Sequence, residues 1–252
     1  MGPPWTQQDI SRVRELYPTH TATQIGIELS RTRRSIKHIT HKFGFRKPQR
    51  DYSLNENQKQ VLLGSLLGDG SIIRRNIKSY TYREPHGIGQ QDYLQWKAQI
   101  LGHLVSSLHP YARYDPRWNR TLWQVAMTMY GKWLKPYHDQ FYPDGHKILP
   151  TQALNELTGL GVAVWFCDDG TKSSETSRLR IYTDSFTMDE AKIISKWFLD
   201  KFDIITHITP RPHKPTHPII EVPSSSTGTF VALIKPYMPI CMNYKITFRE
   251  PS

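Results

Sequence analysis

Two apolar stretches of helical length, each ending in a carboxylate and a glycine, dominate the hydrophobic pattern of the chain. The first covers residues 62–70 (LLGSLLGDG) and the second covers residues 162–170 (VAVWFCDDG). Glycine just after a helix is a common stop signal, because it adopts left-handed backbone conformations without steric cost. Each stretch therefore predicts a buried helix that carries one aspartate, Asp69 or Asp169, at its C-terminal end.

The two stretches belong to a pattern that repeats after about 100 residues. The motif aspartates are separated by 100 positions, and so are the Leu-Lys-Pro-Tyr of residues 134–137 and the Ile-Lys-Pro-Tyr of residues 234–237. The His-Lys-Ile of residues 146–148 returns as Tyr-Lys-Ile at residues 244–246. Three landmarks in the same order indicate an internal duplication, that is, two copies of one small domain.

The apolar positions predict the same order of elements in both copies: helix, two strands, helix, two strands and helix. The first copy is expected to begin its motif helix at Asn55 or Asn57, followed by a strand pair over 72–83, a helix over 92–104, strands over 111–114 and 122–129, and a helix over 131–141. The second copy is expected to have helices over 154–169, 187–202 and 227–237, and strands over 179–186, 204–209 and 219–222.

Residues 1–48 carry a separate pattern of three short amphipathic helices. Hydroxyl side chains precede each apolar run in positions that suit an N-cap. The expected caps are Thr6 for the first helix, Thr21 or Thr23 for the second, and Ser30 for the third.

The third helix, expected over residues 31–43, has a basic outward face formed by Arg31, Arg33, Arg34, Lys37, His38, His41 and Lys42. Three helices with a basic last one predict a DNA-binding helix-turn-helix, and the run resembles Myb-like and resolvase-like modules. A helical bundle that docks another protein is the alternative. The polar, proline-containing residues 47–51 predict a linker, so the expected domains are 1–48, 49–150 and 151–252.

The charge of the chain favours a polyanionic partner. It has 33 basic and 22 acidic residues, a formal net charge of +11 and a pI of about 9.6. Nucleic acid is the usual partner of such a protein, and a membrane surface is the alternative. No apolar run is long enough to span a bilayer, and the first residues do not resemble a signal peptide. Two cysteines cannot form an all-cysteine zinc site. We therefore expect an intracellular protein of the cytoplasm, nucleoid or an organelle matrix, not a secreted one.

Small residues recur at every fourth position of the motif helices: Gly64 and Gly68 in the first, and Gly159, Ala163 and Cys167 in the second. Such stripes let two helix backbones approach closely. If the two helices pack together, Asp69 and Asp169 lie side by side. Two adjacent carboxylates repel each other and favour a cation between them, and oxygen ligands suit magnesium. The sequence thus predicts a divalent-metal site of the kind that hydrolyses phosphodiesters.

Both motif stretches resemble the LAGLIDADG motif of homing endonucleases, and the second is similar to the Trp-Phe-x-Asp-Asp-Gly variant of the single-chain, two-motif branch. The resemblance extends over roughly residues 55–250 and includes three flanking segments of the second copy: 182–186, 233–237 and 242–246. Leu67 and Cys167 replace the first aspartate of the motif name. Val164 replaces an expected small residue, which predicts an offset seam between the helices.

The resemblance implies an α+β fold of two pseudo-symmetric αββαββα halves whose antiparallel sheets form a saddle over duplex DNA. Basic and amide side chains on such sheets can read base edges. The sheet residues expected to face the DNA grooves are Arg74, Arg75, Tyr80, Tyr82, Arg83, Gln124, Lys172, Arg178, Arg180 and Tyr182. In the N-terminal module, Arg31, Arg33, Arg34 and Lys37 are the expected DNA contacts.

The resemblance also implies the ligands of the catalytic metal, which would be Mg²⁺ or Mn²⁺. Asp69 and Asp169 match the aspartates that bind the divalent ions in this family. The backbone carbonyls of Gly68 and Asp168 match the family's further ligands.

A basic residue near the active site is the last feature that the resemblance implies. Lys245 matches a residue that polarises the water or steadies the phosphate. Its counterpart in the first half falls at Lys147 by the internal repeat, or at His146 by the spacing to the second motif. We favour Lys147, so the expected catalytic set is Asp69, Asp169, Lys147 and Lys245.

The function that these features imply is site-specific cleavage of double-stranded DNA by a monomeric homing endonuclease, intron-encoded or free-standing, without a membrane partner. One alternative is an intron RNA-splicing maturase, with intron RNA as the partner. Another is a transcriptional regulator that binds DNA through its helix-turn-helix and has a silent LAGLIDADG core. The presence of both aspartates favours cleavage, although it is compatible with a dual role.

Overall fold

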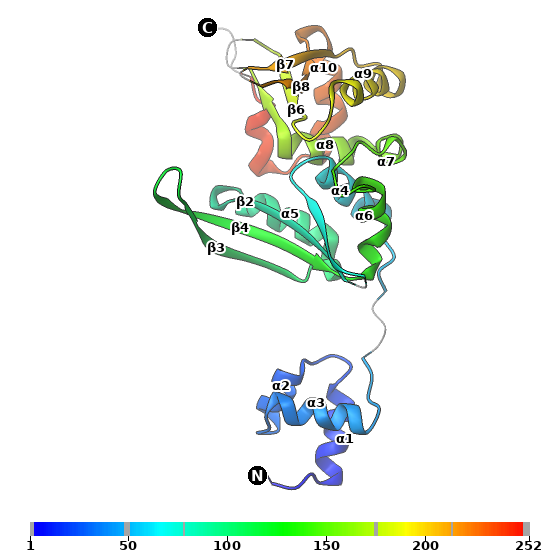
Figure 1. The fold of residues 1–252 in the computed structure, drawn as a ribbon, viewed down its shortest axis with the longest axis vertical. Coiled ribbons are helices and arrows are strands. Elements are labelled where there is room, and N and C mark those ends of the chain that lie inside the picture. Colours follow the sequence, from blue (N-terminus) through cyan, green and yellow to red (C-terminus); the bar gives the residue numbers. More distant parts are fainter. Residues whose placement is uncertain (1–2, 48–50, 78, 174–175, 213, 249–252) are drawn as a thin grey trace. The chain divides into compact units, whose positions relative to one another are not determined.

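A computed structural model describes residues 3–47, 51–77, 79–173, 176–212 and 214–248. The chain forms two compact units that divide between residues 52 and 53 (Figure 1). The expected linker over residues 47–51 includes residues 48–50, which lie outside the described residues.

The N-terminal unit consists of three helices, α1 (Gln7–Leu16), α2 (Ala22–Glu28) and α3 (Arg33–Lys42). Thr6 and Thr21 cap α1 and α2 through capping boxes, as predicted. The expectation that Ser30 caps the third helix is wrong. Thr32 is the cap, because its hydroxyl accepts a hydrogen bond from the Ser35 amide, whereas Ser30 has a φ of 50° in the preceding turn.

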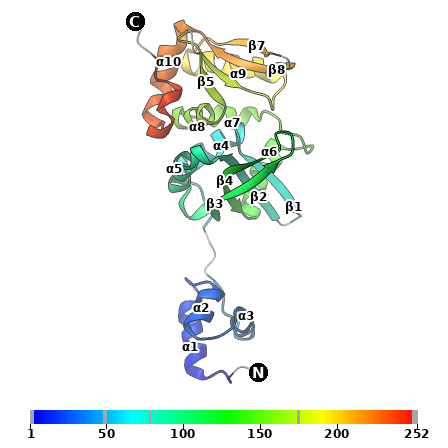
Figure 2. The same ribbon diagram turned by 90° about the vertical axis from the view of Figure 1, so that its left-hand side faces the viewer.

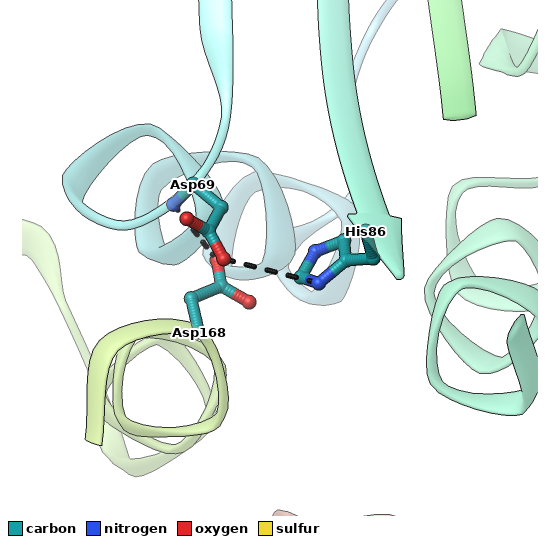
Figure 3. A group of neighbouring side chains, drawn as sticks. All are labelled: Asp69, His86 and Asp168. Carbon is teal, nitrogen blue, oxygen red and sulfur yellow. Dashed lines mark hydrogen bonds and ion pairs between the residues drawn. The ribbon is translucent and has the colours of Figure 1, made fainter. Parts of the chain in front are cut away.

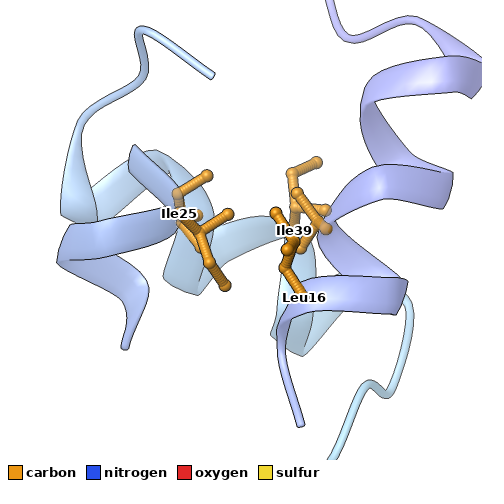
Figure 4. Packing of buried hydrophobic residues seen from close by; sticks show 5 residues of the cluster. Leu16, Ile25 and Ile39 are labelled. Carbon is orange, nitrogen blue, oxygen red and sulfur yellow. The ribbon is translucent and has the colours of Figure 1, made fainter. Parts of the chain in front are cut away.

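A small apolar core holds the three helices together. Its buried members come from every helix: Val13, Leu16, Ile25, Ile36 and Ile39 (Figure 4). Burying such a side chain stabilises a fold by about 1.5–3 kcal/mol. The cluster therefore explains how so short a segment forms its own compact unit.

The second unit begins with a seven-element half. Its helices and strands are α4 (Glu56–Leu67), β1 (Ser71–Asn76), β2 (Ser79–Gly87), α5 (Gln91–Leu101), β3 (Ser107–Asp115), β4 (Arg120–Tyr130) and α6 (Lys135–Phe141). Short 3₁₀ turns lie at Ile88–Gln90, Gly102–Leu104 and Lys132–Leu134. Asn55, the first of the two predicted caps, accepts a hydrogen bond from the Gln58 amide. The strands form one antiparallel sheet in the order β1-β2-β4-β3.

The other half repeats this arrangement after a short additional helix. It contains α7 (Thr151–Glu156), α8 (Gly159–Asp169), β5 (Gly170–Lys172), β6 (Leu179–Tyr182), α9 (Met188–Phe202), β7 (His207–Arg211), β8 (Lys214–Val222), α10 (Ser224–Ile234), and 3₁₀ turns at Lys235–Tyr237 and Ile240–Lys245. Its sheet order, β5-β6-β8-β7, matches that of the first half. The predicted α+β fold with two αββαββα halves is confirmed.

Several predicted element boundaries in the second half are wrong, since β7, β8 and α10 begin at His207, Lys214 and Ser224 instead of at 204, 219 and 227. Two further differences have a specific cause. The single helix expected over 154–169 is broken between α7 and α8, because the Gln60 side chain of α4 occupies the break. Its Oε1 accepts from the Thr158 amide at 2.7 Å and its Nε2 donates to the Glu156 carbonyl at 2.9 Å. The strand expected over 179–186 ends at Tyr182, because a turn follows in which the Phe186 amide donates to the Thr183 carbonyl at 2.9 Å.

The motif helices α4 and α8 pack against each other between the two sheets (Figures 1 and 2). A Cβ on Gly64 would lie 2.4 Å from the Gly161 carbonyl oxygen, and one on Gly68 would lie 2.6 Å from the Asp168 side chain. The predicted close approach is thus present, and the seam of α8 runs along Gly161, Val164 and Asp168. The expected stripe of that helix is wrong at Gly159, which meets Tyr237 and Leu233 instead.

Glycine is required at the end of each motif for a different reason from the one expected. The left-handed glycines of the described chain do not include Gly70 or Gly170. A Cβ on Gly70 would lie 2.7 Å from the Ser65 carbonyl, and one on Gly170 would lie 2.3 Å from the Phe166 carbonyl. Lack of space for a side chain, not a positive φ, therefore requires glycine here.

Candidate active site

The seam between α4 and α8 brings the two motif aspartates to one cavity. Asp69 follows the end of α4 and Asp169 is the last residue of α8. Both line a cavity of about 230 Å³ whose other walls are Leu67, Gly68 and residues 182–186. The structure thus brings together the two carboxylates that the sequence placed 100 residues apart.

The two carboxylates differ in their surroundings. Asp69 is exposed, whereas burial raises the pKa of Asp169 to about 8, and the nearby carboxylates of Asp69 and Asp168 add to the effect. Lys147 and Lys245 oppose the shift only in part. The cavity alone therefore stabilises the ionised form of Asp169 poorly, and a cation bound between the two aspartates would favour that form. Carboxylate and carbonyl oxygens of this kind fit a hard divalent cation, which Asp69 and Asp169 could hold.

Two lysines reach the motif ends in equivalent ways. The Lys147 Nζ donates to the Gly68 carbonyl at 2.8 Å, and the Lys245 Nζ donates to the Cys167 carbonyl at 2.6 Å. Burial lowers the pKa of both lysines, although nearby carboxylates act in the other direction. Of the two alternatives for the first half, Lys147 lies beside the motif, while His146 is exposed.

The Asp168 side chain lies behind Asp69 instead of in the cavity. Its Oδ2 accepts from the Asp69 amide at 3.4 Å, and its Oδ1 accepts from the Tyr93 hydroxyl at 2.7 Å. His86 completes a group whose ligand atoms all lie within 4.8 Å of one another (Figure 3). His86 was not expected at this site from the sequence. Its only signal is the alternation of β2, in which Glu84 and His86 continue the inward face of the strand.

On the first sheet, polar side chains form a chain across the face that points away from the helices. The Arg83 Nη2 donates to the Tyr111 hydroxyl at 3.0 Å, and that hydroxyl donates to the Gln124 Oε1 at 2.6 Å. Strand register puts the three residues on one face. Tyr111 and Gly87 both pair with Gln124, and Arg83 shares the face of Gly87 because it lies four residues earlier in the same strand. Arg74 and Arg75 are exposed on the edge strand β1.

Tyr80 and Tyr82 do not belong to that face, and their expected exposure is wrong. Both are buried, with exposed fractions of 1% and 0%. In a strand, alternate residues face opposite sides. Since Tyr82 pairs with the buried Ile72, the two tyrosines point toward the helices, and the Tyr82 hydroxyl donates to Glu84.

On the second sheet, an acid lies between the expected arginines. Glu221 is 7% exposed and accepts from the Arg180 Nε at 3.1 Å and from the Arg178 Nη1 at 3.2 Å. Tyr182 lies under the Arg211 guanidinium, which is 5.2 Å from the ring centroid. Lys172 donates to the Thr247 carbonyl. Glu221, Arg211 and Tyr111 were not singled out from the sequence, because only strand pairing brings them to these faces.

The LAGLIDADG DNA endonuclease family model matches residues 59–230. The chain belongs to the LAGLIDADG DNA endonuclease family. It is 29% identical over 210 residues to DNA endonuclease I-ChuI of Chlamydomonas applanata, covering 77% of this chain and 96% of that protein. It is 26% identical over 208 residues to Protein RecA of Mycolicibacterium chitae, again over 77% of this chain. The chain spans about half the length of such RecA relatives, 47% in this case.

A solved homing endonuclease structure has the same fold. The homing endonuclease I-WcaI bound to its DNA recognition sequence superposes with a TM-score of 0.72 at 21% identity, covering 94% of this chain and 99% of that one. Within the described part of our chain, every helix is too short or too polar to cross a membrane.

The N-terminal unit lies outside the residues that the LAGLIDADG model matches. Arg33, Arg34 and Lys37 are exposed on α3. Arg31 is not available as expected, because it pairs with Asp9 at 3.0 Å and stacks on Trp5, with its guanidinium 4.6 Å from the ring centroid. Arg31 therefore ties the N-terminal segment to the turn before α3.

Proposed function

We propose that this protein is a site-specific double-strand DNA endonuclease that uses Mg²⁺ or Mn²⁺ held between Asp69 and Asp169. The observation that carries the proposal is that the C-terminal ends of two packed motif helices put both aspartates in one cavity. Polar and basic side chains on the outward faces of the two flanking sheets support DNA as the substrate. Among its relatives, I-ChuI is named a DNA endonuclease and I-WcaI was solved on its recognition sequence.

The residues of the cavity divide the chemistry between them. When bound, a divalent ion supplies an activated water and stabilises charge on the leaving oxygen. Asp69 and Asp169 would hold it from opposite halves of the chain. Lys147 and Lys245 keep an ammonium group beside each motif end, where it can steady a phosphate oxygen or polarise the water. The carbonyls of Gly68 and Asp168 are the further ligands that we propose.

The direct test is cleavage of a host-derived or randomised duplex library with Mg²⁺, and then with Ca²⁺ in its place. Discrete double-strand cuts with Mg²⁺ alone would support the endonuclease and identify its target. Specific binding without cutting in either metal would contradict the proposal and favour a regulator or an RNA-binding maturase, which intron RNA would then distinguish.

We also propose the domain assignment that the sequence suggested. Residues 1–48 would act as a helix-turn-helix domain that contacts DNA through Arg33, Arg34 and Lys37, which are exposed on one helix. Residues 49–150 and 151–252 would be the two halves, present in one chain and active as a monomer. The sheet contacts that we propose are Arg74, Arg75, Arg83, Gln124, Lys172, Arg178, Arg180 and Tyr182. An enzyme with this substrate would act in an intracellular compartment that contains DNA.

Removing residues 1–48 is expected to weaken DNA binding and to flatten its salt dependence. Loss of three phosphate contacts would lower the slope of log K against log salt by about 3. The measurement is binding in Ca²⁺ at several salt concentrations. The full chain with Arg33, Arg34 and Lys37 replaced by alanine should behave like the truncated chain. An unchanged slope in both variants would show that α3 does not touch this DNA.

Replacing Glu221 by glutamine is expected to strengthen non-specific duplex binding on the order of threefold, because it removes a negative charge from the DNA-facing sheet and releases two arginines. The matched control is Glu156→Gln on α7. It removes one carboxylate charge, as Glu221→Gln does, and it breaks the 2.7 Å ion pair between Glu156 and Lys59. Binding to unrelated duplex should tighten only in the Glu221 variant. An equal gain in both variants would attribute the effect to net charge alone.

A further inference from the structure

A cluster of buried charges lies behind Asp69, and the proposed chemistry does not use it. Lys97 of α5 is at its centre. Its Nζ lies 2.7 Å from the Asp168 Oδ1, 2.5 Å from the Glu84 Oε1 and 2.9 Å from the Ser65 Oγ. The side chains of Lys97, Glu84 and Asp168 are completely buried. The cluster thus joins α5 and β2 of the first half to the second motif helix.

Such a cluster is a costly way to stabilise a fold. Removing charges from water costs several kcal/mol per ion, and well-packed apolar residues often serve equally well. Burial lowers the pKa of Lys97, but the carboxylates of Asp168 and Glu84 outweigh it and keep the ammonium charged. An ion cluster, unlike an apolar core, fixes the geometry of the polar groups around it.

Lys97 is linked to Asp69 on two sides, directly through Asp168 and indirectly through Glu84 and His86. The Asp168 Oδ2 accepts from the Asp69 amide at 3.4 Å. On the other side, the Glu84 Oε1 is 2.9 Å from the His86 Nε2. The His86 Nδ1 is 2.9 Å from the Gln90 Oε1 and faces the Asp69 Oδ2 at 3.8 Å, an electrostatic contact longer than a hydrogen bond (Figure 3). Both the backbone and the carboxylate of Asp69 are therefore bordered by residues of the cluster.

The second half has an aromatic core at the equivalent place. Where α4 has Ser65, α8 has Trp165, 100 residues later. Trp165 stacks on Phe198 of α9 with ring centroids 6.4 Å apart, and Phe166 packs edge-on against Phe230 at 5.3 Å. Of the two motif aspartates, Asp69 thus lies in front of an ionic cluster, whereas Asp169 ends a helix that packs in an aromatic core.

We propose that Lys97 is a positioning residue that fixes Asp69 against the second motif helix, so that the buried cluster sets the rate of one of the two strand cuts. This inference rests on the proposed cleavage function. It goes beyond that function because it makes the two halves of the site unequal: disturbing the cluster should slow the strand cut that depends on Asp69 more than the other cut.

The test uses the full chain and follows both strands of an end-labelled target duplex under single-turnover conditions with Mg²⁺. Asp69→Asn and Asp169→Asn first define which strand depends more on which aspartate. The variant Lys97→Met with Glu84→Gln and Asp168→Asn removes the buried charges together, so that no unpaired ion remains. His86→Gln breaks the other link to Asp69 and leaves the Lys97–Glu84 pair intact.

We expect the triple variant and His86→Gln to slow the Asp69-dependent strand at least tenfold more than the other strand, with binding in Ca²⁺ unchanged. Lys201→Met on α9, which removes a lysine that donates to the Leu157 carbonyl at 2.7 Å, should give no strand bias. Equal slowing of both strands, or wild-type rates in folded His86→Gln, would overturn the inference. Failure of the wild-type protein to cut would instead overturn the proposed function, so the two failures are distinguishable.

Discussion

Asp169→Asn is expected to lower the rate of DNA cleavage by about 10³-fold or more while duplex binding in Ca²⁺ stays within about threefold. A bound metal ion stabilises the transition state by several kcal/mol, and each 1.4 kcal/mol is about tenfold in rate. Asparagine keeps the shape of Asp169 but removes the charge that holds the ion. The measurement is single-turnover cleavage of the identified target with Mg²⁺.

The control for this prediction is Asp200→Asn on α9, an exposed carboxylate that pairs with Lys196 at 2.8 Å, which should cut normally. If the Asp169 variant still cut DNA at the wild-type rate, Asp169 would not be a metal ligand. If the variant lost DNA binding as well as cleavage, the role of Asp169 would be structural.

The same substitution has an expected effect on stability in metal-free buffer. Burial raises the pKa of Asp169 to about 8, from an ordinary value of 3.8, so its ionisation is harder in the folded chain than in the unfolded chain. The wild-type protein with EDTA should therefore lose stability as the pH rises from about 4 to 8, and added Mg²⁺ should restore it. The asparagine variant should lack this part of the pH dependence. Thermal melting across the pH range measures both.

Gly64→Ala is expected to destabilise the two-sheet unit by about 1–3 kcal/mol or more, because overpacking a closely fitted interface forces the backbone to move. The added Cβ would lie 2.4 Å from the Gly161 carbonyl oxygen and 2.9 Å from the Val164 Cβ. A shift of α4 against α8 would also separate the two aspartates, so cleavage should fall with stability. Denaturant unfolding and the cleavage assay measure the two effects.

Gly228→Ala is the matched control for this substitution. Gly228 lies in helix α10 with open space where a Cβ would be. Alanine there should stabilise the helix by about 0.5–1 kcal/mol. Normal stability and cutting of the Gly64 variant would show that the seam has room for a side chain.

The amino-acid sequence by itself determined the elements that depend on near neighbours. The cap Thr6, and the caps Thr21 and Asn55 as one of two candidates each, follow from a side chain that bonds an amide three residues away, whereas the cap of the third helix was misplaced by two residues. The two motif helices and their terminal aspartates follow from apolar runs of helical length. The duplication follows from the repeat of about 100 residues, and it correctly implied that both halves share one order of elements.

Contacts between distant residues were decided only by the tertiary structure. Gln60 breaks the second motif segment from 98 positions away, which no local pattern of residues 151–169 reveals. The register of β1 and β2 turned Tyr80 and Tyr82 inward, and a one-residue change of register would reverse every side chain. The sequence likewise did not determine which face of α8 meets α4, because Gly159 and Gly161 are both small. The cluster around Lys97 depends on the strand register and on the helix packing together, since its members come from four different elements.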